Sequence, residues 1–174
     1  MGEAPATPVS PGTLRVGPSG TLTDTGIVDG TVLNDGGTVS PGLSPGALTI
    51  NADYDQQGGE LLLEVASATV FDQLVVGGKA LLNGDLVLLF LNDFLPSSRE
   101  VFTDVIAFRS IELGEHFRIL TPGIVWTYEV QVSSAGLSLR SLSDASRAPE
   151  PTTLALVGLG LAGLCAVRRR RLAA

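Results

Sequence analysis

Apolar and polar residues alternate over several short stretches in the middle of the chain. The stretches 48–50, 61–65 and 86–90 each place an apolar side chain at every second position. A period of two is the pattern of a β-strand that buries one face, because successive side chains point to opposite sides of the strand. We therefore predict short strands whose core-facing residues are Leu48, Ile50, Leu61, Leu63, Val65, Leu86, Leu88 and Phe90.

A three-residue unit recurs along the same region. It consists of a glycine, a small or polar residue, and then Leu or Val, and its copies begin at Gly12, Gly20, Gly30, Gly37, Gly46, Gly59 and Gly84. Taking every second copy gives steps of 18 (12 to 30), 17 (20 to 37), 16 (30 to 46) and 22 (37 to 59) residues. Such steps are typical of one round of a solenoid that turns a corner at each glycine.

The fold class predicted from this pattern is all-β, a short right-handed parallel β-helix. An antiparallel sandwich with frequent hairpins is the alternative, since the turn signals at 34–37 and 83–84 suit both architectures. The aromatic residues favour the β-helix, because the first 53 residues contain none and those from Phe71 to Tyr128 come later. Narrow rounds stack aliphatic side chains, whereas a terminal cap needs bulk to close an exposed edge.

The resulting domain organisation has five parts. Residues 1–11 form a flexible N-terminal tail, 12–90 the β-helix, 91–143 a β-rich C-terminal cap, 144–148 a linker and 149–174 a C-terminal signal. Within the cap, we expect Trp126, Tyr128, Val130 and Val132 to face inward along one strand and Leu137 and Leu139 along the next.

Composition and charge narrow the possible functions. Hydrophobic residues make up 44% of the chain and charged residues 17%, which favours a folded body over a disordered one. The formal net charge is -7, although four of the 11 basic residues lie at 168–171, so the body is strongly acidic. Phosphate backbones would repel such a body, and nucleic-acid binding is not expected. Cys165 is the single cysteine, which excludes an internal disulfide or a CxxC metal site.

Candidate chemistry in the body is sparse. Carbohydrate-active enzymes use paired carboxylates, for which the chain offers Asp53, Asp55, Glu60, Glu64, Asp72 and Asp85. Acidic residues at corners and outward positions are ordinary solubilising groups, so we predict no catalytic residues and no enzyme activity. His116 stands alone, and no metal or other cofactor is expected, with calcium near Asp24, Asp29, Asp35 and Asp53 as a lesser alternative.

The last 26 residues have three parts: Pro149-Glu150-Pro151, an apolar segment at 152–167, and Arg168, Arg169, Arg170 and Arg171. The 14 uncharged residues from Leu154 to Val167 would span about 21 Å as a helix, against about 30 Å for the hydrocarbon core of a membrane. We predict one short transmembrane helix there, with the arginines on the cytoplasmic side. The GxGxxG at Gly158, Gly160 and Gly163 lacks the following helix and strand of a dinucleotide site.

These C-terminal residues resemble the PEP-CTERM sorting domain of Gram-negative bacteria. The resemblance implies that Pro149, Glu150 and Pro151 are recognised by an exosortase, a membrane enzyme similar to a cysteine transpeptidase, which cleaves nearby and releases or transfers the protein outward. The segment Met1–Ala6 has no basic and apolar signal for export, so we expect the natural start of the chain to lie upstream.

A second resemblance covers residues 37–90, from the stretch at Ser40–Ile50 to Phe71–Gly78. It looks like the autotransporter-associated passenger repeat, which implies a β-helical surface or secreted protein. We therefore predict an exported, non-enzymatic protein of the cell surface or extracellular matrix, adhesin-like and associated with biofilm or exopolysaccharide, that contacts the membrane transiently. The alternatives are a carbohydrate-active enzyme on a β-helix and a single-span membrane protein with a periplasmic domain.

Overall fold

The computed structural model describes residues 12–42 and 45–148, and every regular element in these ranges is a β-strand. The predicted all-β class is confirmed, with 64% of the described residues in strands. The strands are β1 (Gly12–Val16), β2 (Thr21–Asp24), β3 (Ile27–Val28), β4 (Gly30–Pro41), β5 (Ala47–Ile50), β6 (Tyr54–Ser67), β7 (Val70–Phe71), β8 (Gln73–Val76), β9 (Lys79–Leu82), β10 (Asp85–Phe90), β11 (Val101–Ala107), β12 (Ser110–Leu113), β13 (Arg118–Leu120), β14 (Ile124–Val125), β15 (Tyr128–Val132), β16 (Gly136–Ser141) and β17 (Ser146–Arg147).

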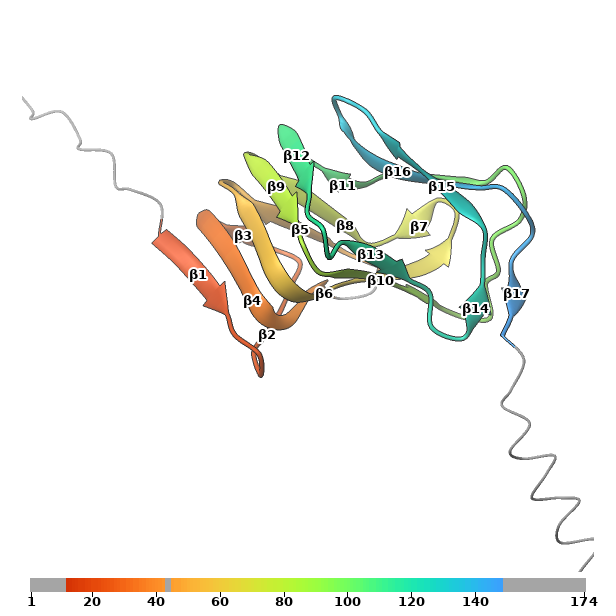
Figure 1. Cartoon of the computed structure of the whole chain (residues 1–174), viewed down its shortest axis with the longest axis horizontal. Helices are drawn as coiled ribbons and strands as arrows, with labels where there is room; N and C mark the ends of the chain where they lie inside the picture. Colours follow the sequence, from red (N-terminus) through yellow and green to blue (C-terminus); the bar gives the residue numbers. More distant parts are fainter. Residues whose placement is uncertain (1–11, 43–44, 149–174) are drawn as a thin grey trace, which may run out of the picture.

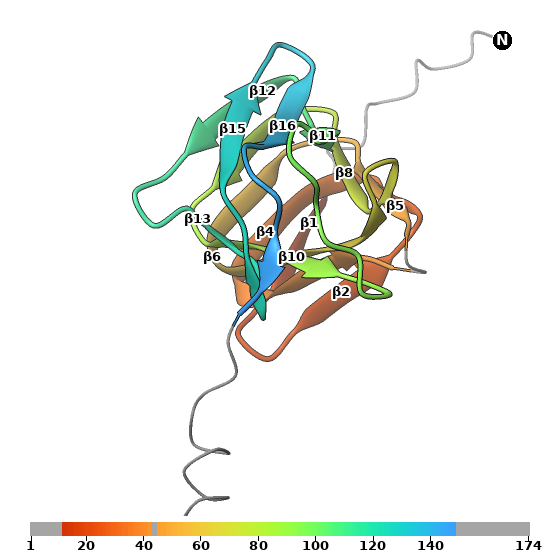
Figure 2. The ribbon, with the colours of Figure 1, turned by 90° about the vertical axis from the view of Figure 1, so that its right-hand side faces the viewer.

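Most strands pair in parallel, in three ladders that surround a shared interior (Figures 1 and 2). The first ladder runs β1, β4, β6, β9 and β12, and the second runs β2, β4, β6, β10 and β13, because β4 and β6 are long enough to bend and join both. The third ladder runs β3, β5, β8 and β11. Among the described strands, antiparallel pairing is confined to β6–β7, β11–β16, β15–β16 and β14–β17.

The register of the second ladder shows how much of the glycine spacing is correct. Thr21 lies beside Thr38 and Thr38 beside Glu60, so the predicted steps from Gly20 to Gly37 and from Gly37 to Gly59 are confirmed. In the first ladder, Gly12 lies beside Gly30. The predicted step from Gly30 to Gly46 is wrong, because β4 continues through the corner and Gly46 precedes β5 on the third ladder.

The core is formed by the inward side chains of neighbouring parallel strands. Seven of the eight residues predicted from the alternation are buried: Leu48, Ile50, Leu61, Leu63, Val65, Leu86 and Leu88. Phe90 is half-buried and packs edge-to-face on Trp126 with ring centroids 5.6 Å apart. The parallel pairing does not stop at residue 90, since β11, β12 and β13 extend all three ladders.

Aromatic side chains close the end of the core that faces β16. Phe102 and Trp126 are buried with ring centroids 5.5 Å apart at 84°, and Trp126 Nε1 donates to Ser141 Oγ at 2.8 Å. Leu137 and Leu139 of β16 are buried as predicted, but the prediction for Val130 and Val132 is wrong, since both are exposed. Their strand β15 is the edge of the six-stranded sheet, so only one flank of it is covered.

The C-terminal part of the described chain is tied back to the cap. Residues 144–148, which we predicted to be a linker, include β17, and β17 pairs with β14. None of the described residues forms a helix of the length and hydropathy needed to cross a membrane. The tail 1–11, the sorting motif 149–151, the predicted transmembrane helix 152–167 and the arginines 168–171 lie outside the described residues.

Candidate binding groove

The recurring triplet of the sequence builds an outward-facing row of polar side chains on the second ladder. In the triplets that begin at Gly37, Gly59 and Gly84, the glycine lies at the corner and the third residue is buried in the core, as Val39, Leu61 and Leu86 are. The middle residue points outward, because side chains alternate along a strand. The register aligns the middle residues of four triplets with Arg118, which lies beside Asp85 on β13. The row consists of Thr21, Thr38, Glu60, Asp85 and Arg118.

The corner glycines beside this row allow neighbouring backbone segments to approach closely. A Cβ added at Gly59 would lie 2.2 Å from the carbonyl oxygen of Gly37, and Gly59 has a φ of 72°, which side chains disfavour. A Cβ at Gly84 would lie 2.6 Å from the carbonyl oxygen of Gly59. The floor beside the row is consequently bare backbone.

A groove of about 860 Å³ follows these corners across the rounds. Its walls come from the turn before β2, the bends of β4 and β6, and the turns before β10 and β13, together with the polar row itself. The lining residues are Pro18, Gly36, Gly37, Thr38, Gln57, Gly58, Gly59, Glu60, Asn83, Gly84, Asp85, Glu115, His116 and Arg118. The groove therefore runs across the strands, parallel to the direction in which the rounds stack.

Two contacts order the end of the groove nearest β13. Arg118 binds both carboxylate oxygens of Asp85, with Nε to Oδ1 at 2.9 Å and Nη2 to Oδ2 at 3.0 Å. Asn83 Oδ1 accepts the backbone N–H of His116 at 3.0 Å and lies 3.3 Å from His116 Nδ1. Glu60 is exposed, and within the described part of the chain it forms no ion pair.

Buried amide side chains hold the corners from inside the core. Asn34 Oδ1 accepts the N–H of Gly37 at 2.8 Å, and its Nδ2 donates to the carbonyl of Glu60 at 3.2 Å. In the next round, Gln56 Nε2 donates to the carbonyls of Gly59 at 3.0 Å and Asp85 at 3.2 Å. The groove floor is thus hydrogen-bonded on its inner side, which keeps its shape fixed. Beside these amides Tyr54 is fully buried, and burial raises the pKa of its phenol.

The charge of the groove is negative. Glu60, Asp85 and Glu115 contribute three carboxylates, against the single guanidinium of Arg118. An anionic polymer is disfavoured in such a groove, whereas hydroxyl groups can donate to the carboxylates and accept from the guanidinium.

Of the other acidic residues considered from the sequence, Asp72 has a structural role instead. Asp72 is fully buried, and its oxygens accept the N–H of Gly46 at 2.6 Å and of Glu64 at 2.9 Å. Burial raises the pKa of the Asp72 carboxyl even though both hydrogen bonds oppose the shift. Burial, followed by the nearby Asp72 charge, also raises the pKa of Glu64.

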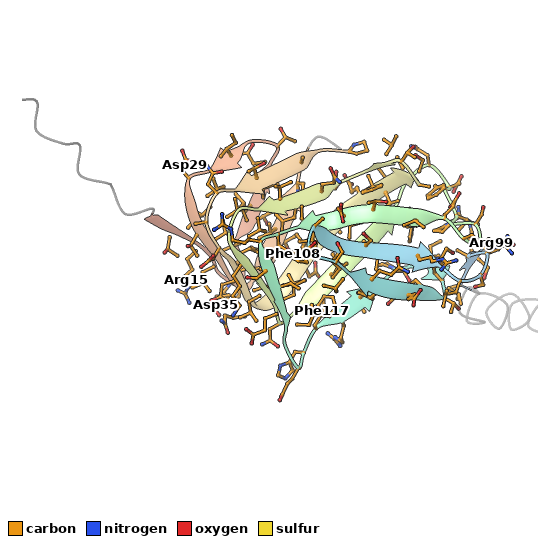
Figure 3. All side chains as sticks on the ribbon, turned by 90° about the horizontal axis from the view of Figure 1, so that it is seen from above. Arg15, Asp29, Asp35, Arg99, Phe108 and Phe117 are labelled. Atoms are coloured by element: carbon orange, nitrogen blue, oxygen red, sulfur yellow. The ribbon has the colours of Figure 1, made fainter. Side chains whose placement is uncertain are left out.

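The four aspartates considered for calcium are not brought together. Asp24 accepts the N–H of Gly26, Asp29 binds Asn51, Asp53 accepts the N–H of Lys79, and Asp35 pairs with Arg15. Figure 3 shows Asp35 and Arg15 side by side at the end of the molecule that carries β1. Among residues 12–42 and 45–148 no group of three or more His, Cys, Asp or Glu side chains could hold a metal ion.

The groove was not predicted from the sequence. The triplets contain the residues of the polar row up to Asp85, but only the register between neighbouring strands shows that these residues align. Arg118 lies outside any triplet, because Phe117 precedes it where the triplets have glycine.

Comparison with known proteins identifies the C-terminal segment. The model of the PEP-CTERM protein-sorting motif matches residues 147–171, which include Pro149, Glu150, Pro151 and the four arginines. No curated protein and no solved structure matches the chain. The motif indicates an exported protein that is processed by an exosortase, and it covers only the end of the chain. The resemblance of residues 37–90 to the autotransporter-associated repeat stays a prediction.

Proposed function

We propose that the chain is a non-enzymatic protein of the cell surface or extracellular matrix whose body is a short β-helix that displays a binding surface. The observation that carries the proposal is the PEP-CTERM motif at residues 147–171, directly after a folded all-β body. The three parallel ladders support a β-helical body, since stacked rounds with parallel pairing are the pattern of that fold.

The mature protein would be released from the membrane or transferred outward after cleavage near Pro149–Pro151. In this account the arginines at 168–171 hold the tail on the cytoplasmic side until an exosortase acts. The body then needs neither a catalytic centre nor a lasting anchor, because its role is to present a stable polar surface outside the cell.

The proposal is tested in the native bacterium with the Glu150→Ala variant and the matched Glu129→Ala variant, whose side chain is exposed on β15. We expect Glu150→Ala to accumulate at the membrane as a full-length chain, while Glu129→Ala reaches the exterior as the unchanged protein does. Release of both variants at equal rates would contradict recognition of the motif.

An enzyme on the same scaffold is the second candidate, favoured by the neighbouring Glu60 and Asp85 of the groove. Both carboxylate oxygens of Asp85 accept hydrogen bonds from Arg118, so this carboxylate is already engaged and poorly placed to act on a substrate. A reducing-sugar assay on neutral and acidic polysaccharides separates the two candidates. Turnover that disappears in Glu60→Gln would establish the enzyme and overturn the non-enzymatic proposal.

A further inference from the structure

We propose that the groove binds a neutral, hydroxyl-rich polysaccharide, with the extended sugar chain lying along the row Thr38, Glu60, Asp85 and Arg118. The inference rests on the proposed function, because only an exported protein would meet such a polymer outside the cell. It assigns the binding surface to one face of the body, at the corners between the first and second ladders.

The dimensions of the row suit a linear polymer. Neighbouring strands in a sheet lie about 4.8 Å apart, so the three steps from Thr38 to Arg118 cover about 14 Å. The spacing of about 4.8 Å between neighbouring strands is close to the length of one sugar ring in an extended chain. Each ring would therefore meet one position of the row. The groove is open at its sides and crosses several rounds, which accommodates a chain that continues beyond it.

The functional groups of the row match alcohol groups better than charged ones. Sugar hydroxyls can donate to the Glu60 carboxylate and exchange hydrogen bonds with the Thr38 hydroxyl. Arg118 has five N–H donors, of which two are directed at Asp85, so others remain for sugar oxygens. The excess of carboxylates disfavours uronic-acid or sulfated polymers, because like charges would be brought together in a shared groove.

The bare glycine floor lets a sugar ring approach the backbone. Gly58 lines the groove, and a Cβ added there would meet nothing nearer than the backbone of Gly36 at 3.9 Å. Its conformation requires no positive φ, unlike that of Gly59. A large side chain at residue 58 can therefore fill the groove without separating the stacked rounds, which makes it a specific probe of binding.

The test is the migration of the full chain, in non-ionic detergent, through native gels that contain a soluble polysaccharide. Hydroxyethylcellulose, barley β-glucan and dextran are the neutral probes, polygalacturonate the anionic one and glycol chitosan the cationic one. We expect at least one neutral polymer to retard the protein, polygalacturonate not to retard it, and the retardation to persist at high salt, where exposed ionic contacts are screened.

Four variants place the binding in the groove. Gly58→Trp should weaken retardation by the neutral polymer about tenfold, whereas Gly12→Trp should not change it, because a Cβ at Gly12 meets nothing within 4 Å. Glu60→Ala should weaken it about tenfold through loss of a charged acceptor, and the exposed Glu129→Ala is its matched control. Urea midpoints followed by far-ultraviolet circular dichroism, which the added tryptophans do not dominate, confirm that each variant folds.

The inference is overturned if no neutral polymer retards the protein, if folded Gly58→Trp binds as the unchanged protein does, or if glycol chitosan alone retards it. The last result would assign binding to the general acidity of the body. A protein that is exported and processed but fails this test refutes the groove assignment alone. A protein retained unprocessed in the cytoplasm refutes the proposed function, whatever it binds in gels.

Discussion

Asp72 provides the sharpest test of how the rounds are joined. This carboxylate is fully buried between β7 and β8, and it accepts backbone N–H groups from Gly46, before β5, and from Glu64 of β6. It therefore links two different ladders. We expect the Asp72→Ala variant to lose both links.

The magnitude follows from the two donors that would be left without an acceptor. A buried N–H without a partner costs about 1–3 kcal/mol, so Asp72→Ala should lower the free energy of unfolding by about 2–6 kcal/mol. Asp72→Asn keeps one acceptor oxygen and places an amide beside the other N–H, which predicts a loss of about 1–3 kcal/mol. Domains of this kind are stable by only about 5–15 kcal/mol, so either loss is readily measured.

Urea denaturation of the purified variants, followed by Trp126 fluorescence, measures these losses. Asp144→Ala is the matched control, because Asp144 also accepts one backbone N–H, from Ser98 at 2.7 Å, but at the exposed surface. We expect the control to lose less than about 1 kcal/mol. A loss for Asp72→Ala no greater than that of Asp144→Ala would refute the reasoning that the buried carboxylate ties the ladders together.

Three further predictions use the same unfolding assay. Gly59→Ala should lower the free energy of unfolding by about 2–4 kcal/mol, because φ at residue 59 is 72° and the added Cβ would overlap the Gly37 carbonyl. The control Gly58→Ala should change it by less than about 0.5 kcal/mol. Equal losses would contradict the close stacking at Gly59. Phe102→Ala should lose about 3–5 kcal/mol by opening the aromatic cap, and a loss below about 1 kcal/mol would contradict that packing. Burial raises the pKa of Asp72 above its ordinary value of 3.8, so the folded state holds this proton to higher pH than the unfolded chain. The stability difference between the unchanged protein and Asp72→Asn should therefore be largest below pH 3.8 and shrink as pH rises through the raised pKa of Asp72, and a difference that grows with pH would contradict the shift.

The alternation of apolar residues predicted the core well, because a strand that buries one face has an apolar residue at every second position. Leu61, Leu63 and Val65 need only the strand period to be placed inward. Val130 and Val132 follow the same period but are exposed, since their strand β15 lies at an edge. Whether a strand has a neighbour on both sides depends on the order of strands in the sheet, which the strand's own sequence does not determine.

The register between rounds was predictable only where the rounds have similar lengths. Thr21 and Thr38 are 17 residues apart and Thr38 and Glu60 are 22 apart, but Asp85 and Arg118 are 33 apart because the chain makes longer excursions between them. The groove depends on this register, so its polar row could not be assembled from local patterns. The C-terminal motif was recognisable because its three parts are contiguous.

Export of the protein and cleavage near its C-terminus are the basis of the proposed function. Intact-mass spectrometry of the protein recovered from its native bacterium tests this directly. We expect the extracellular or surface fraction to contain a chain that ends near Pro149–Pro151 and lacks the arginines at 168–171. A cytoplasmic chain that retains Arg168–Arg171 through to Ala174 would contradict the account.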